Sequence, residues 1–196
     1  MGNQNEFLDR KDNIEENALK LENGNDPFVG FRAWQIIPGV GIAAINYPFL
    51  WPHNKPLEAI HVASRNPAPC LPFEKCTCGL YALGNLEKLT DLVRQIFEDY
   101  SRYSILFCIG ATLHWGRVTV GKTGLRSTMA QPLAFLEPTE YLSDFFGNES
   151  VAYLPELQSY WNQLLLEVNR WARVYQIPVL KTSGLETYAH EFGIAS

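Results

Sequence analysis

The sequence lacks the features that mark membrane and secreted proteins. Its longest apolar stretches, 36–50 and 105–120, are interrupted by Gly, Pro, His or Arg. Neither stretch is close to the roughly 18–20 apolar residues that a membrane-spanning helix needs. Residues 1–26 are polar and acidic and contain no apolar segment of the secretory kind. We therefore expect a soluble, cytoplasmic protein that makes no membrane contact.

Basic charge is also scarce. The chain has 16 Lys and Arg residues against 21 Asp and Glu residues, which gives a net charge of -5. Because proteins neutralise nucleic-acid phosphates with Lys and Arg, this balance excludes a general nucleic-acid binder. Arg117, Lys122 and Arg126 form the densest basic stretch. Their density is close to background, so we interpret them as solvated strand and turn positions.

The composition is that of a folded domain. Apolar residues make up 46% of the 196 residues and charged residues only 19%, which excludes a disordered or coiled-coil chain. This length fits one domain with a tail. We expect a polar acidic tail or weak helix over 1–26 and a core domain over 27–140. A C-terminal helical segment over 150–196 is expected to pack on that core.

The apolar pattern predicts an α+β fold with a mixed, mostly antiparallel sheet. A helix is expected over 86–100, because Asn85 is a good N-cap and the apolar residues share one helical face. A long C-terminal helix is expected over 155–175, with Pro155 in its first turn. The expected strands are Phe31–Ile37, Gly41–Tyr47, Ser104–Ile109, Leu113–Val120 and a segment near Leu125–Met129.

A proline-rich loop follows the first two expected strands, from Trp51 to Pro72. Proline removes a backbone donor and restricts its neighbours, so this stretch is expected to be irregular. Loops of this length in compact domains are often functional. Trp34 and Trp115 are expected in the core, whereas Trp51, beside His53 in the loop, is expected to form a pocket or contact surface. The predicted binding surface consists of Trp51, His53 and Tyr81.

Four cysteines without a secretory signal indicate a reducing compartment and thiols or metal ligands. In extended backbone, residues two apart project to the same face, so Cys76 and Cys78 could hold one ion. A structural zinc is therefore one prediction. The other is that these cysteines are small buried hydrophobic residues, as Cys108 is expected to be. The predicted zinc ligands are His61, Cys70, Cys76 and Cys78, with His53 as an alternative fourth ligand.

A catalytic thiol is a different hypothesis for the same region. Cys78 would need an adjacent base, and His61 or His114 could supply one. Nothing in the local sequence places such a base beside it. His114 lies in an alternating stretch between Leu113 and Trp115, which is typical of a half-buried surface histidine.

The segment Gly116–Thr123 reads GRVTVGKT and matches the phosphate-loop pattern G-x-x-x-x-G-K-[ST]. A phosphate loop needs a flexible backbone followed at once by a helix. Here Val118, Thr119 and Val120 are stiff β-branched residues, and the residues after Thr123 look like a strand. A strand, a turn and a second strand are the simpler interpretation, and nucleotide binding is the weaker alternative.

Several short motifs, in this order, resemble a family of small uncharacterised bacterial proteins that is frequent in actinobacteria. The resemblance covers about residues 30–137 and carries no known activity. It implies a β-hairpin around 116–124, and it implies that the C-x-C-G cysteines belong to the family pattern. Relatives often carry a cysteine at the position of His61, which suits a ligand exchange. The matching motifs are Gly30-Phe31-Arg32-Ala33-Trp34, Trp51-Pro52, Glu58-Ala59, Cys76-Thr77-Cys78-Gly79-Leu80-Tyr81-Ala82, Ile109-Gly110, Trp115-Gly116-Arg117-Val118, Gly124-Leu125-Arg126-Ser127 and Ala130-Gln131-Pro132.

These observations favour a non-enzymatic binding or adaptor domain. It would present its proline-rich, cysteine-anchored loop to a protein partner or a small ligand, with or without a structural zinc. The alternative from another class is a small enzyme that uses Cys78, or a metal site, together with His61 or His114. It requires a cysteine and a histidine within hydrogen-bond distance in a concave pocket.

Overall fold

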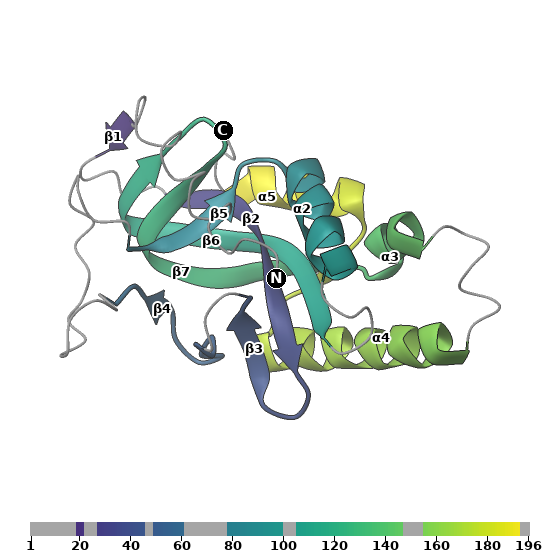
Figure 1. Ribbon diagram of the computed structural model, residues 1–196. Helices are drawn as coiled ribbons and strands as arrows, with labels where there is room; N and C mark the ends of the chain where they lie inside the picture. Colours follow the sequence, from purple (N-terminus) through teal and green to yellow (C-terminus); the bar gives the residue numbers. More distant parts are fainter. Residues whose placement is uncertain are drawn as a thin grey trace.

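The computed structural model describes residues 19–21, 27–45, 49–60, 78–99, 105–146 and 155–192. The expected α+β class is confirmed: these residues form four helices and a sheet in which every pairing except β7–β8 is antiparallel. In Figure 1 the helices gather toward the right of the view. The strands are β1 (Leu19–Leu21), β2 (Phe28–Ile37), β3 (Gly41–Ala44), β4 (Leu57–Glu58), β5 (Leu80–Leu83), β6 (Leu106–Val120), β7 (Gly124–Leu136) and β8 (Val179–Leu180). The helices are α2 (Leu86–Asp99), α3 (Thr139–Phe146), α4 (Pro155–Tyr175) and α5 (Thr182–Phe192).

Two long strands, β6 and β7, pair with each other and make up the main part of the sheet. The two strands expected over 104–109 and 113–120 are one continuous strand, β6. Gly110 lies inside this strand. Because it has no side chain, the strand can approach β7 closely there. A Cβ at Gly110 would lie 2.1 Å from the Ala134 carbonyl oxygen. A tight turn joins the pair, with Gly121 N donating to Gly124 O at 2.7 Å.

One end of the sheet closes into a four-stranded barrel. β6 pairs with β2, β2 with β5, β5 with β7, and β7 with β6. The β2–β5 seam is narrow, with Phe31 opposite Leu83 as its register pair. Glycines permit the close approach: a Cβ at Gly30 would lie 2.6 Å from Ala82 Cβ, and one at Gly124 would lie 2.2 Å from Ala82 O. Ala82, Val118 and Leu125 form a small apolar cluster of their own.

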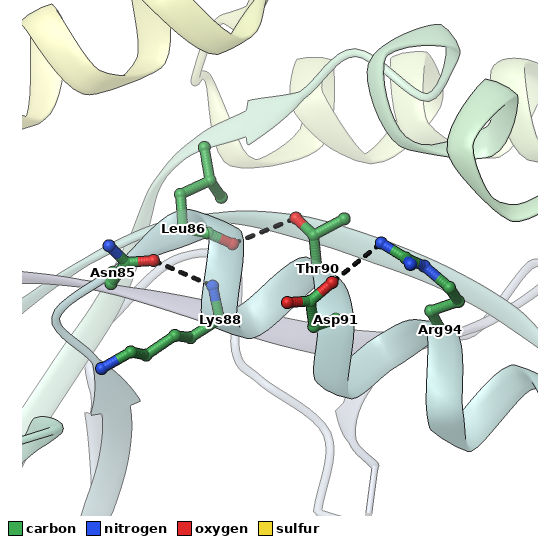
Figure 2. Close-up of polar contacts among 6 residues, drawn as sticks. All are labelled: Asn85, Leu86, Lys88, Thr90, Asp91 and Arg94. Carbon is green, nitrogen blue, oxygen red and sulfur yellow. Dashed lines mark hydrogen bonds and ion pairs between the residues drawn. The ribbon is translucent and has the colours of Figure 1, made fainter.

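Helix α2 covers part of the main core, and its expected position is confirmed. Asn85 Oδ1 accepts a hydrogen bond from Lys88 N at 2.9 Å, which caps the first turn (Figure 2). Thr90 Oγ1 donates to Leu86 O, and Arg94 pairs with Asp91 on the exposed side. Leu86, Leu89 and Val93 are buried on the opposite side. The helix ends at Asp99, and residue 100 lies outside the described residues.

The C-terminal residues belong to the same core as the sheet. α4 occupies Pro155–Tyr175 and is followed by β8 and α5, so it is not the last helix. Tyr160 Oη donates to Ile105 O, and Tyr141 Oη of α3 donates to Phe107 O. β8 pairs with β7 in parallel, so the segment expected to pack on the core also contributes a strand to its sheet.

The N-terminal tail contributes an edge strand. Leu19–Leu21 form β1 and pair with Val118–Val120 of β6. The rest of the region predicted as a tail, 1–18 and 22–26, lies outside the described residues. Within the part of the chain that is described, no helix combines the length and apolar character needed to cross a membrane.

Candidate binding site at the mouth of the barrel

The segment around Trp51 is fixed to the edge of β3. Trp51 N donates to Ile42 O at 2.9 Å, and Ala44 N donates to Phe49 O at 3.3 Å. Tyr175 Oη, at the end of α4, donates to Trp51 O. Backbone bonds and a tyrosine from a distant helix therefore hold the start of the proline-rich stretch in one position.

The ring of Trp51 is buried, which corrects the expectation that it is displayed for contact. Its exposed fraction is 3%. The ring packs edge-on against Trp34 with centroids 5.6 Å apart, and the guanidinium carbon of Arg32 lies 5.2 Å from its centroid. A large amphipathic ring gains most when its apolar surface leaves water, and here the core beside β2 offers that space. Trp51 therefore acts as an anchor.

The neighbours of Trp51 are exposed instead. Val40 at the β2–β3 turn is 57% exposed, Phe49 is 40% exposed and Leu50 is 45% exposed. Leu50 Cδ2 lies 3.3 Å from the position of a Cβ on Gly41, so Leu50 rests against the hairpin that carries Val40. We call Val40, Phe49 and Leu50 the hairpin patch. His53 is exposed nearby, its ring perpendicular to Tyr175 with centroids 6.5 Å apart.

A polar group lies on the inner side of the barrel. The β2–β6 register places Arg32 opposite Gly110, Gly30 opposite Thr112 and Phe28 opposite His114. Side chains two residues apart share a face, so Arg32, Thr112 and His114 project to the same side. Thr112 and His114 are both 0% exposed, and Arg32 is partly buried. We call these three residues the inner wall.

The hydrogen bonds of His114 determine its tautomer. His114 Nδ1 lies 2.8 Å from Ser127 Oγ, and the Ser127 hydroxyl donates to Met129 O at 2.7 Å. Since that hydroxyl proton is used, Nδ1 must carry a proton and donate to Ser127. Nε2 is then an acceptor, and it has no hydrogen-bond partner among the residues that the structure describes. The inner wall therefore presents a lone pair from a buried neutral imidazole.

His114 corrects the expectation of a half-buried surface histidine. Alternation along β6 indicated an outward side chain, but closure of the barrel makes that face an interior face as well. Burial, with a smaller effect of the Arg32 guanidinium, lowers the pKa of His114 to about 3. Among the described residues, the hydrogen bond of this imidazole is the one to Ser127. The Cys78–His114 pair of the enzyme hypothesis stays a prediction.

Arg32 bridges the barrel beside the narrow β2–β5 seam. Its Nη1 donates to Tyr81 O of β5, and its Nε has no hydrogen-bond partner in the described part of the chain. Burial lowers the pKa of Arg32 to about 10, so the guanidinium remains charged at neutral pH. No carboxylate within the described residues forms an ion pair with it. Arg32, Trp51 and the Tyr81 carbonyl define what we call the mouth of the barrel.

The predicted zinc site lies largely outside the described residues. This holds for His61, Cys70 and Cys76, and Cys78 is a half-buried residue just before β5. No group of three or more His, Cys, Asp or Glu residues in the described ranges could hold a metal ion. The zinc therefore stays a prediction. Cys108 is buried as expected, and burial raises the pKa of its thiol well above the ordinary value.

The segment that matches a phosphate loop is part of a hairpin. Gly116–Val120 belong to β6, and β7 begins at Gly124 without a helix. Gly116 has a φ of 76°, and Arg117 N donates to Thr128 Oγ1 at a register shift between the strands. The helix that nucleotide binding requires is absent at this hairpin. Arg117 and Lys122 are exposed as expected, but Arg126 is 7% exposed, because β5 packs beside it.

Sequence reasoning did not identify the inner wall. A signal was present, since Thr112 and His114 are the polar residues two apart in the first, otherwise apolar part of β6. Their side chains share the inner side of the barrel with Arg32 only because β2, β5, β7 and β6 close into one ring. Tyr81 is half-buried, and its backbone oxygen accepts the hydrogen bond from Arg32. Its place in the predicted binding surface stays a prediction.

No protein-family model matches the chain, no curated protein matches it, and no solved structure matches it.

Proposed function

We propose that the chain is a non-enzymatic binding or adaptor protein and that the hairpin patch is its recognition surface for a protein partner. The supporting observation is the contrast around Trp51. The anchor is 3% exposed, while Val40, Phe49 and Leu50 beside it are each at least 40% exposed. Grouped exposed apolar side chains are typical of protein contact sites.

The surroundings of the patch favour recognition. Backbone bonds to β3 and the Tyr175 hydrogen bond hold Phe49 and Leu50 in place before any partner arrives. Pre-organised surfaces lose less conformational entropy on binding. Exposed His53 adds a polar group at the rim, which is the arrangement common in protein interfaces.

The test compares partner retention between matched variants. Tagged protein is isolated from its native cells, and the retained proteins are quantified by mass spectrometry. We expect the double variant Phe49→Ser/Leu50→Ser to lose a partner that the wild type retains. The control Leu166→Ser, at a 64% exposed leucine of α4, should retain it. Equal retention by all three proteins would contradict the proposal, provided that circular dichroism shows each variant folded.

We further propose that a structural zinc, held by His61, Cys70, Cys76 and Cys78, ties the segment after Ile60 to the start of β5. Thiolates and imidazole form the donor set that zinc prefers. Elemental analysis of protein purified without added metal is expected to give one zinc per chain. Loss of that zinc from the Cys76→Ser/Cys78→Ser variant would support the ligand set. Wild-type protein that is metal-free and has reactive thiols would contradict the proposed zinc site.

A further inference from the structure

The inner wall holds buried polar atoms for which none of the described residues supplies a hydrogen-bond partner. These atoms are Arg32 Nε, Thr112 Oγ1 and His114 Nε2. Trp51 Nε1, whose ring lies beneath the Arg32 guanidinium, lacks such a partner too. A buried polar group without a partner is destabilising, and most such groups in folded proteins are satisfied. Three such atoms along one inner face and a fourth on the ring beside Arg32 therefore indicate a place that receives a polar partner.

The donors and acceptors in this group define what that partner must be. Arg32 Nε and Trp51 Nε1 can only donate, whereas Thr112 Oγ1 can donate or accept. His114 Nε2 can only accept, since Nδ1 carries the proton that Ser127 receives. A partner that fits all of them needs at least one acceptor atom and one hydrogen-bond donor, and a hydroxyl group is an uncharged donor that can lie near the Arg32 cation.

The positive charge of Arg32 narrows the class of possible ligands further. Arg32 is a cation at the mouth of the barrel, and no carboxylate among the described side chains pairs with it. An incompletely compensated cation in a poorly solvated position favours a negatively charged ligand. His114 is neutral and offers a lone pair, so a fully ionised oxyanion without a hydroxyl would leave Nε2 unsatisfied.

We propose that the mouth of the barrel binds a small oxyanion that also carries a hydroxyl group, of the 2-hydroxycarboxylate or hydrogen-phosphate class. Arg32 and Trp51 donate to the ionised oxygen, and the ligand hydroxyl donates to His114 Nε2. Thr112 bonds to either oxygen. This site is separate from the hairpin patch, and it does not depend on the patch having a protein partner.

Glycolate and acetate form the matched probe pair, because they differ by one hydroxyl group. The experiment follows the Arg32 Nε–H signal by NMR in arginine-labelled full-length protein, assigned with Arg32→Lys. Titrations are run at neutral pH and constant ionic strength, so that general screening does not change. We expect saturable shifts, with glycolate bound about tenfold more tightly than acetate, the effect of one hydrogen bond. Titration with hydrogen phosphate shows which member of the class is preferred.

Two threonine variants separate ligand binding from folding. Thr112→Val keeps the shape of the side chain and removes its hydroxyl, and we expect it to weaken glycolate binding several-fold. Thr187→Val removes an exposed hydroxyl of α5 and should bind glycolate like the wild type. A wild-type Arg32 signal that does not shift saturably, or glycolate and acetate binding that is equal, overturns the proposal.

Discussion

At the scale of single residues, His114 shows most clearly how this fold holds a polar side chain in its interior. The imidazole is completely buried, donates to Ser127 and stays neutral. Protonating it would place a second positive charge beside Arg32 in a site shielded from water. The buried imidazole of His114 therefore stays neutral and serves as a hydrogen-bond acceptor through Nε2.

Between pH 6.5 and about pH 3, the unfolded chain should bind a proton at His114 that the folded chain does not bind. The ordinary histidine pKa is 6.5, and the pKa of folded His114 is about 3. Stability from this residue is present above pH 6.5 and is lost as the pH falls from 6.5 toward 3. The free energy of unfolding should fall by up to about 1.4 kcal/mol per pH unit from this group alone.

Urea unfolding of the wild type and of His114→Asn, at several pH values between about 6 and 4, measures this contribution. The variant cannot gain that proton, so its stability should depend less steeply on pH, whatever its absolute stability. Parallel curves for the two proteins would show that His114 titrates freely in the fold.

At the scale of elements, closure of the sheet depends on glycine. Gly30, Gly110 and Gly124 stand where a Cβ would collide with the facing strand. Each collision would push apart two strands of the ring, so the barrel tolerates no side chain at these positions. Gly184 in α5 differs, since its nearest neighbour would be Leu180 Cβ at 3.8 Å.

Alanine at these two kinds of glycine should have opposite effects. Gly110→Ala places a methyl group 2.1 Å from the Ala134 carbonyl oxygen and should destabilise the fold by several kcal/mol. Gly184→Ala should stabilise it by up to about 1 kcal/mol, because alanine favours helix and has space there. Thermal unfolding of both variants measures the difference. Similar unfolding temperatures would contradict the strand packing described here.

Local elements could be predicted from the sequence, and the closure could not. Helix α2 was predictable because its N-cap and its apolar face are encoded within fifteen or so neighbouring residues. The hairpin at 116–124 was predictable from its β-branched residues and its glycines. The barrel depends on β2 meeting β5, which are joined by the single register pair Phe31–Leu83. No periodicity in either strand encodes that distant contact, so the sequence pattern predicts His114 and Arg126 at the surface and Trp51 in an exposed loop.

At the scale of the whole molecule, Trp51 contributes its ring to one proposed site and its backbone to the support of the other. Its ring lies beneath Arg32 at the mouth of the barrel, and its backbone holds Phe49 and Leu50 at the hairpin patch. One rigid scaffold thus supports an inner polar site and an outer apolar surface. Helix α4 adds to this support through the hydrogen bond from Tyr175 to Trp51 O, so we expect the C-terminal residues to help the proposed recognition surface keep its shape.

The most direct test of the proposed recognition surface is amide hydrogen exchange of the full chain, free and bound to the partner isolated with it. We predict that binding slows exchange in the β2–β3 turn and in residues 49–54, and leaves the exposed side of α4 around Leu166 unchanged. Slowed exchange on α4, with no change at Val40, Phe49 and Leu50, would contradict the account.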